Sequence, residues 1–155
     1  MQKNQKTETK RRRLSPEERR VELLEAAIEV LKTIGPANAR VEDITKAAGA
    51  AKGTFYLYFP SWQDMLIAIR EHMLKQYVTA MKKRFVCHTA EEWWAAFENE
   101  SREFIRFREN SEKLHKAIFH GEISEHPIAP SLSAGTVISG WLQKGIEVSA
   151  CRDID

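Results

Sequence analysis

The clearest hydrophobic pattern in the chain is an apolar stripe with helical spacing near the N-terminus. Apolar residues that recur three and four positions apart predict a helix packed along one face. The segment Ser15 to Glu18 supplies a capping serine, a proline and two glutamates at its start, and Gly35-Pro36 ends it. The stripe consists of Val21, Leu24, Ala27, Ile28 and Leu31.

Two short helices and one long helix are predicted next. The first runs from Val41 to Ala48, the second from Lys52 to Tyr58, and the long one starts at Ser61 and ends near Lys82. The aromatic run in the second short helix also suits a β-strand, but no neighbouring segment would pair with it. The inward stripe of the long helix is Met65, Leu66, Ile69, Met73, Tyr77 and Ala80.

The second half of the chain continues the helical spacing. A helix begins at Thr89, another follows a break at Asn110-Ser111 and ends around His126-Pro127, and a last one begins near Ser133. The chain is therefore predicted to be all-α. The stripes of these three helices are Trp93, Phe97, Phe104 and Phe107, widened by Trp94 and Ile105; Leu114, Ala117 and Ile118; and Val137, Ile138, Trp141, Leu142 and Ile146.

Composition fits a soluble globular protein, with 43% hydrophobic and 30% charged residues among 155. The net charge of +2 conceals a basic N-terminus, which indicates either an anionic partner or a solubilising tail. No secretory signal or membrane-length apolar run is present, and the two cysteines form no disulfide framework, so we expect a cytoplasmic protein with no membrane partner. The basic residues are Lys3, Lys6, Lys10, Arg11, Arg12 and Arg13.

Residues 40–59 show the order of a helix-turn-helix unit, whose second helix reads the major groove of DNA. Gly49 lies at the turn, and the second helix would bury Phe55 and Phe59, four residues apart. The positions that face outward carry groups that contact phosphates and base edges. An ordinary solvated helix face is the alternative interpretation. These outward residues are Lys52, Thr54, Tyr56 and Tyr58.

The segment RVEDITKAAGAAKGTFYLYFPSWQDML resembles the signature of the tetracycline-repressor (TetR) family of bacterial regulators, in order and without gaps. The preceding EERRVELLEAAIEVLKTIG is similar to the first helix of that family. The resemblance implies a flexible arm at 1–14, a DNA-binding domain at 15–77 and a helical effector-binding and dimerisation domain at 78–155. It also implies a repressor that binds a palindromic operator as a homodimer and is released by a small-molecule effector.

By position, the resemblance assigns Lys52 to a base contact and places its neighbour Gly53 in the same DNA-contacting segment, with Thr54, Tyr56 and Tyr58 on phosphates or bases. The sequence departs from the family pattern at three positions. Arg40 stands where members have a threonine or serine cap, Thr45 replaces an alanine, and Trp62 replaces a lysine that faces the DNA backbone. We expect Trp62 either to pack on the sugar-phosphate edge or to fold inward, and the arm residues Arg11, Arg12 and Arg13 to compensate from the minor groove.

The aromatic stripe that begins at Trp93 is interpreted first as plain core. It also suits the wall of an effector pocket enclosed by the helices that start near Thr89, Ser111 and Ser133. Trp93, Trp94, Phe97 and Phe104 are the apolar candidates for this wall. Asn99, Ser101 and His120 are the polar ones.

Other chemistry finds little support in the sequence. The histidines and glutamate of 115–126 match no metal-ligand spacing, so we expect no metal and no cofactor. No nucleophile–base arrangement indicates an enzyme, and Cys87 and Cys151 have no basic cluster that favours a redox role. Two function classes remain: a ligand-controlled repressor, and an interaction or ligand-binding protein of the same fold with weak DNA binding.

The ending GIEVSACRDID bears on assembly. In the family resemblance such a segment leads into two further helices that form a four-helix dimer interface. Either the second domain is incomplete at Asp155, which we favour, or the helix with Trp141, Leu142 and Ile146 exposes an apolar face that pairs in another way. We expect this polypeptide to be a weak dimer or an aggregation-prone monomer with an exposed apolar patch near Trp141.

Overall fold

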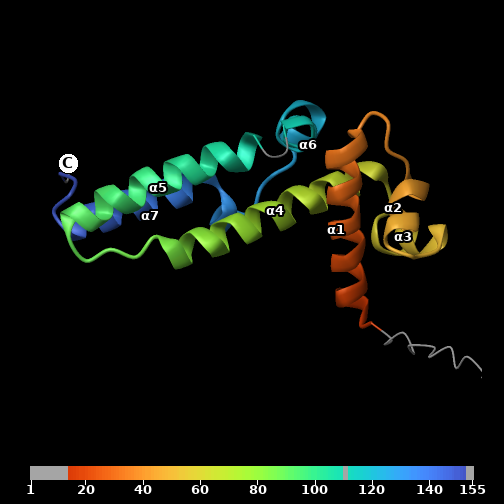
Figure 1. The fold of residues 1–155 in the computed structure, drawn as a ribbon, viewed down its shortest axis with the longest axis horizontal. Helices are drawn as coiled ribbons and strands as arrows, with labels where there is room; N and C mark the ends of the chain where they lie inside the picture. Colours follow the sequence, from red (N-terminus) through yellow and green to blue (C-terminus); the bar gives the residue numbers. More distant parts are fainter. Residues whose placement is uncertain (1–13, 110–111, 153–155) are drawn as a thin grey trace, which may run out of the picture.

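The computed structural model describes residues 14–109 and 112–152. All regular structure in these two ranges is helical, and no β-strand occurs within them. Three N-terminal helices form a compact group, and a long fourth helix leads away from it to a second group of helices (Figure 1). The prediction of an all-α chain is confirmed. The predicted arm with Arg11, Arg12 and Arg13 lies outside the described residues.

Helix α1 (Pro16–Ile34) begins and ends where its sequence predicts. The Glu18 N–H donates to the Ser15 hydroxyl at 3.2 Å, and the Ser15 N–H donates to the Glu18 carboxylate at 2.7 Å. This capping box satisfies helix-start N–H groups that have no partner inside the helix. Gly35 ends the helix at φ 81°, where a side chain would be strained. The buried face is Leu23, Leu24, Ala27, Ile28 and Leu31.

Helix α2 (Val41–Ala47) packs beside α1, and α3 (Lys52–Tyr58) packs against α2, to which a tight turn joins it. Gly49 lies in this turn at φ 57°, in the left-handed region. Each helix has seven residues, too few for stability alone. Ile44, Phe55 and Phe59 hold both helices in place because they are almost fully buried in the core that also contains the apolar face of α1.

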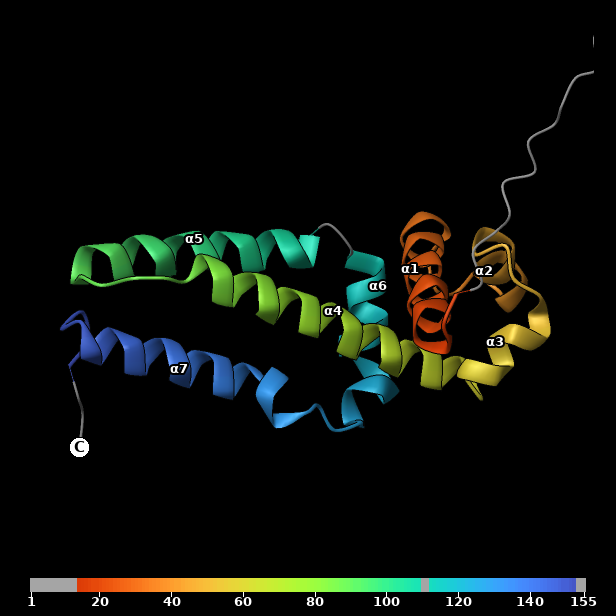
Figure 2. The same ribbon diagram turned by 90° about the horizontal axis from the view of Figure 1, so that it is seen from below.

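Helix α4 (Trp62–Arg84) connects this core to the rest of the molecule. Ser61 caps it, its hydroxyl accepting from the Asp64 N–H at 3.1 Å. The first half of α4 closes the N-terminal core, and the second half lies along α5 (Ala90–Glu109) and α7 (Ala134–Glu147) (Figure 2). At its last residue, the Arg84 guanidinium donates to both carboxylate oxygens of buried Glu100 on α5, at 2.6 and 2.9 Å.

The connection between α5 and α7 differs from the predicted long helix. Helix α6 (Glu112–Phe119) ends before His120, and two short 3-10 helices follow, η1 (Gly121–Glu125) and η2 (Pro130–Leu132). Buried Arg70 of α4 donates to the main-chain carbonyl oxygen of Ile123 at 2.6 Å, and also to those of His126 and Pro127 at 2.9 and 3.3 Å. These carbonyls face Arg70, so the chain wraps around the guanidinium instead of continuing a helix.

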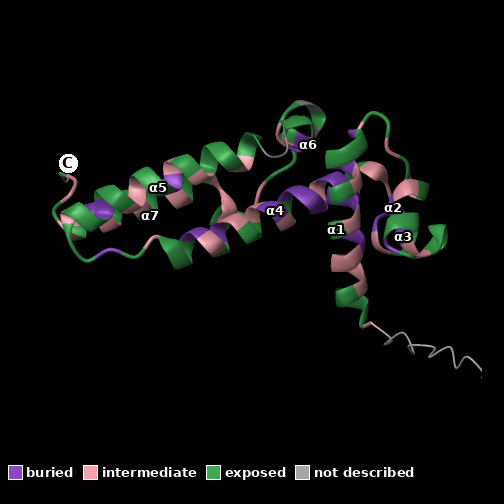
Figure 3. Cartoon of the chain, viewed as in Figure 1, coloured by how far each residue is buried: buried purple, intermediate pink, exposed green. Residues whose placement is uncertain are grey.

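Burial separates two regions of the molecule (Figure 3). The purple, buried positions gather in α1, α2, α6 and the first half of α4, whereas α5 and α7 are largely intermediate or exposed. On α4, Tyr77 and Ala80 were predicted to face inward, but both are only half-buried. Val78 and Met81 are the buried residues in this part of the helix. The large apolar side chains exposed on α5 and α7 are Trp94, Phe104, Ile105, Ile138 and Leu142.

Candidate nucleic-acid interface and ligand cavity

Helix α3 presents one face to solvent because aromatic rings anchor the other. The Phe55 ring lies 5.5 Å from the Phe59 ring and meets Tyr56 edge-on at 5.3 Å. Lys52 and Gly53 are exposed and Tyr56 is 49% exposed. Of the other predicted contact residues, Thr54 is half-buried, and Tyr58 is half-buried against the core.

Lys52 carries the positive charge of this face and is already paired. Its ammonium lies 2.5 Å from the Glu42 carboxylate of α2, and both side chains are more than half exposed. The hydrogen bond to Glu42 raises the pKa of Lys52, and the same bond lowers the pKa of Glu42. Both groups therefore stay charged near neutral pH, and Glu42 holds the ammonium at the junction of α2 and α3.

The three departures from the family pattern each have a structural explanation. Arg40 precedes α2 with extended backbone and makes no side-chain capping bond, but its N–H donates to the Asp43 carboxylate at 2.9 Å, so the half of a capping box that the third helical residue supplies is present. Thr45 is buried and donates its hydroxyl to the Glu42 carbonyl at 3.2 Å, which offsets the cost of burying it. Trp62 is half-buried and packs against the N-terminal core, the inward alternative of the two expected.

Leu57 is the residue on this face that the sequence reading missed. It is 80% exposed, the highest exposure among the large apolar side chains in the described ranges. Two helical positions from buried Phe55 amount to a rotation of about 200° around the helix axis. Helical spacing alone therefore places Leu57 opposite the core, where an apolar group is suited to contact a thymine methyl in the major groove.

A second feature is an apolar cavity of about 360 Å³ between α4, α5 and α7. Ser101 and Phe104 from the predicted pocket set line it. Helix α4 supplies one wall of the cavity, where the sequence predicted α6. The role of α4 was not predicted, because half-buried positions on a long helix give no distinct hydrophobic pattern. The lining residues are Leu74, Tyr77, Val78, Ser101, Phe104, Ile105, Phe107, Leu132, Ala134, Val137, Ile138 and Trp141.

The other predicted pocket residues lie outside this lining. Trp93 is 2% exposed and belongs to the packing between α5 and α7: its ring stacks on Phe97 at 5.1 Å, and its indole N–H donates to the Trp141 carbonyl oxygen at 3.0 Å. Trp94 and Asn99 are exposed on α5. The structure thus gathers two of the seven candidates at the cavity and uses Trp93 as core.

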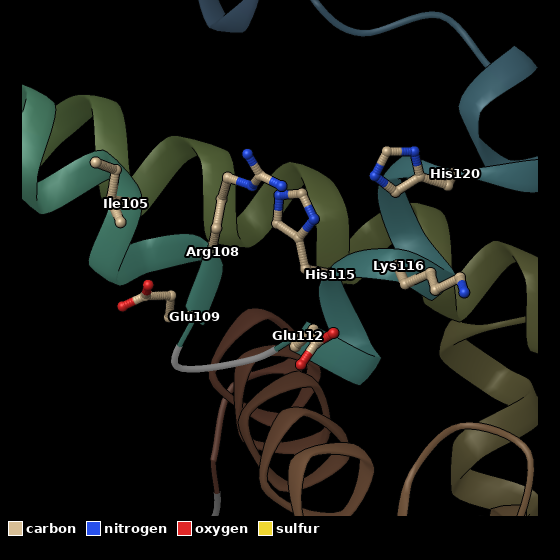
Figure 4. Close-up of a pocket in the computed structure, with 7 residues that line it drawn as sticks. All are labelled: Ile105, Arg108, Glu109, Glu112, His115, Lys116 and His120. Carbon is tan, nitrogen blue, oxygen red and sulfur yellow. The ribbon is translucent and has the colours of Figure 1, made fainter.

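His120 lies in a different hollow, of about 540 Å³, between the end of α5 and α6. Figure 4 shows charged groups of both signs around it, Arg108 and Lys116 with Glu109 and Glu112. His115 in this hollow packs 4.4 Å from the Phe119 ring, and burial lowers its pKa. Within 14–109 and 112–152, no group of three or more candidate ligand side chains is arranged to hold a metal ion.

The structure has two short helices joined by a turn at a glycine, and the second of them is exposed on one face. One long helix joins this unit to a separate helical region. These features define a helix-turn-helix protein. The family model described as bacterial regulatory proteins, tetR family, matches residues 23–69, which span α2, α3 and the adjoining parts of α1 and α4. The chain belongs to the tetR family of bacterial transcription regulators.

Curated relatives agree with this assignment. An uncharacterized HTH-type transcriptional regulator of Bacillus subtilis strain 168, YvdT, is 31% identical over 122 residues, which are 79% of this chain and 62% of that protein. The fatty acid metabolism regulator protein of the same organism is 35% identical over 63 residues, 41% of this chain and 32% of that protein. The chain therefore spans less than two thirds of the length of either relative.

Solved structures show the same fold. A TetR family transcription regulator from Marinobacter aquaeolei VT8 is similar with a TM-score of 0.60 and 20% identity, over 83% of this chain and 69% of that one. The transcriptional regulator FadR from Bacillus subtilis, solved in complex with stearoyl-CoA, is similar with a TM-score of 0.59 and 24% identity, over 87% and 75% of the two chains. None of the described helices combines the length and apolar character needed to cross a lipid bilayer.

Proposed function

We propose that this chain is the DNA-reading and ligand-sensing part of a transcription repressor. The observation that carries the proposal is the α2–α3 unit, in which buried Phe55 and Phe59 leave Lys52, Tyr56 and Leu57 on one exposed face. A helix held in this way enters the major groove, with the ammonium and the hydroxyl available for base edges and phosphates. Thr54, Tyr58, Gly53 and Arg40 flank this face and complete the proposed contact surface.

Additional charge for DNA binding comes from the N-terminal arm. Trp62 brings no charge to the start of α4 and is turned toward the core, so one phosphate contact of the family is absent from that position. Arg11, Arg12 and Arg13 precede α1 directly in the sequence, and basic arms of this kind contact the adjacent minor groove. We propose that they restore the affinity that a lysine at position 62 would supply.

Release by a small molecule is supported by the path of α4. This helix is continuous from Trp62 beside α3 to Arg84, and its middle residues Leu74, Tyr77 and Val78 line the cavity. A ligand that changes the packing around these three residues acts on the same rigid helix that supports the DNA-binding unit. FadR of Bacillus subtilis, which has a similar fold, was solved in complex with stearoyl-CoA. This complex supports a ligand-responsive function for this chain.

We further propose a cytoplasmic homodimer that reads a palindromic operator. One seven-residue recognition helix makes few base contacts, so helix-turn-helix proteins bind two half-sites with two-fold symmetry, about one helical turn or a multiple apart. The apolar side chains exposed on α5 and α7 offer area for such an assembly.

Fluorescence anisotropy tests the DNA-binding part of this proposal. The chain is titrated into labelled DNA from upstream of its own coding region and into a scrambled DNA of equal length, at two salt concentrations. We expect preference for the upstream DNA at both concentrations, and weaker binding of both DNAs at the higher one. Equal affinity for the two DNAs would instead favour a ligand-binding or interaction protein of the same fold, the alternative that the inward Trp62 supports.

A further inference from the structure

The ion pair between Glu42 and Lys52 lies at the exposed junction of α2 and α3. The Lys52 ammonium is 2.5 Å from a carboxylate oxygen of Glu42, and the two side chains are 56% and 58% exposed. Lys52 is the first residue of α3, Glu42 is the second residue of α2, and the turn at Gly49 brings them together. Any group that approaches the ammonium from solvent therefore also meets the carboxylate.

A carboxylate is an unusual group on a surface that binds DNA, because the phosphates repel it. The hydrogen bond from Lys52 and the nearby positive charge of Arg40 both lower the pKa of Glu42, so the group is ionised near neutral pH. The same two cations offset the repulsion from the phosphates. An ionised carboxylate only accepts hydrogen bonds, whereas an ammonium only donates them. The junction therefore presents one donor group and one acceptor group side by side.

A G·C pair presents the complementary arrangement in the major groove. Guanine N7 and O6 are acceptors, and the cytosine N4 amino group, next to O6, is a donor. An ammonium binds N7 and O6, and a glutamate accepts from N4. An A·T pair also has a donor, adenine N6, but its two acceptors lie on opposite sides of that donor. An ammonium held beside the carboxylate would then meet one acceptor instead of two.

We propose that Glu42 and Lys52 together read one G·C pair in each half-site, with the Lys52 ammonium on guanine and the Glu42 carboxylate accepting from the cytosine amino group. The inference rests on the proposed function, which places α3 in the major groove, and it names the base pair that this site selects. Glu42 is then a specificity-determining residue. At a base pair without a suitably placed amino group, its carboxylate would lose water without gaining a donor.

Two base analogues test the two contacts separately. In 7-deazaguanine, N7 is replaced by a C–H group, and in N4-methylcytosine the amino hydrogen that faces the major groove is replaced by a methyl group. Both analogues keep Watson–Crick pairing. Each G·C pair of the upstream DNA is replaced in turn, and anisotropy measures the affinity of the full chain. We expect one position in each half-site at which either analogue weakens binding about tenfold.

Glu42→Ala removes the carboxylate from an exposed position, where a substitution has little effect on folding. At the position found with the parent chain, N4-methylcytosine should now weaken binding by less than about twofold, whereas 7-deazaguanine should still weaken it. The variant should also bind scrambled DNA more tightly, since a negative charge is lost, and it should discriminate less between upstream and scrambled DNA.

Glu29→Ala is the matched control for this variant. Glu29 is also an exposed glutamate, paired at 3.0 Å with Lys32, but it lies on α1. Binding by this control should respond to both analogues as the parent chain does.

Three results would each overturn the inference. The first is a parent chain that N4-methylcytosine weakens at no position, and the second is an equal effect of N4-methylcytosine on the parent and on Glu42→Ala. The third is an equal gain in affinity of Glu42→Ala for upstream and scrambled DNA, which would mean that Glu42 acts only through its charge. Any of these results, together with an intact preference of the parent for upstream DNA, would refute this inference alone. A parent chain without that preference would refute the repressor function as well.

Discussion

Lys52 is exposed to solvent and is also paired with a neighbouring carboxylate. Its ion pair with Glu42 joins two side chains that are each more than half exposed, and such surface pairs contribute little to stability. DNA that offers a phosphate or a guanine edge therefore competes readily for the ammonium. Glu42 remains beside it and disfavours phosphates that approach from its own side, which favours a base contact for Lys52.

We predict that Lys52→Ala reduces preference for the upstream DNA by about 1–3 kcal/mol and relaxes selectivity at one base pair. Lys32→Ala is the matched control, since Lys32 is also a solvated lysine paired with a glutamate, Glu29, at 3.0 Å, but lies on α1. Anisotropy titrations of both variants measure the difference. Equal losses for the two would mean that only overall charge matters and that α3 does not read bases.

Arg70 is the residue that shapes the connection between α6 and α7. Its guanidinium has no exposed surface and donates to three main-chain carbonyls, and burial lowers its pKa. We predict that Arg70→Met lowers the free energy of unfolding by about 2–4 kcal/mol, because those carbonyls lose their donor. Urea denaturation measures this loss. The control is Arg102→Met, since Arg102 pairs with Glu98 on the exposed surface. This variant should change the free energy of unfolding by less than about 0.5 kcal/mol. An equally small change for Arg70→Met would contradict the role assigned to Arg70.

At the scale of elements, the N-terminal helices were predictable because their signals are local. The Ser15 and Ser61 caps and the glycine stops at Gly35 and Gly49 lie within a few residues of the ends they fix. The inward aromatics of α3 also follow from spacing. The course of the chain after α6 does not follow, because it depends on Arg70, a charged residue on an otherwise apolar face, 53 positions from the first carbonyl it binds.

The cavity was predicted in part for a related reason. Ser101 and Phe104 lie on a helix whose amphipathic pattern is clear, and both line it. The pattern cannot distinguish a ring that lines a cavity from one that fills it, so Trp93 and Phe97 carried the same signal although they pack between α5 and α7. Tertiary packing decides which helices face one another. In this molecule it places α4, and not α6, at the cavity.

The two helix-ending glycines provide a prediction at this scale. Gly35 has φ 81° and ψ 151°, and Gly49 has φ 57°. The first conformation is essentially restricted to glycine, whereas the second is the left-handed helical region that other residues enter at a cost of about 1–2 kcal/mol. We predict that Gly35→Ala destabilises the chain more than Gly49→Ala when both are measured by urea denaturation. The reverse order would contradict the backbone conformation assigned to the end of α1.

At the scale of the whole molecule, the exposed apolar side chains of α5 and α7 bear on assembly. Phe104, Ile105 and Ile138 are about half exposed, and contiguous apolar surface of this kind promotes association. We predict that analytical ultracentrifugation of the 155-residue chain shows weak, concentration-dependent self-association. A tight dimer that persists at nanomolar concentration would contradict this expectation.

The central claim is that α3 reads the major groove of DNA, and dimethyl sulfate footprinting tests it most directly. This reagent methylates guanine at N7, in the major groove, and adenine at N3, in the minor groove. On the DNA upstream of the coding region, we predict protection of guanine N7 in two half-sites about one helical turn or a multiple apart. The placement of α3 in the major groove would be contradicted if only adenine N3 were protected. It would also be contradicted if no base were protected under conditions where the DNA is fully bound by the chain.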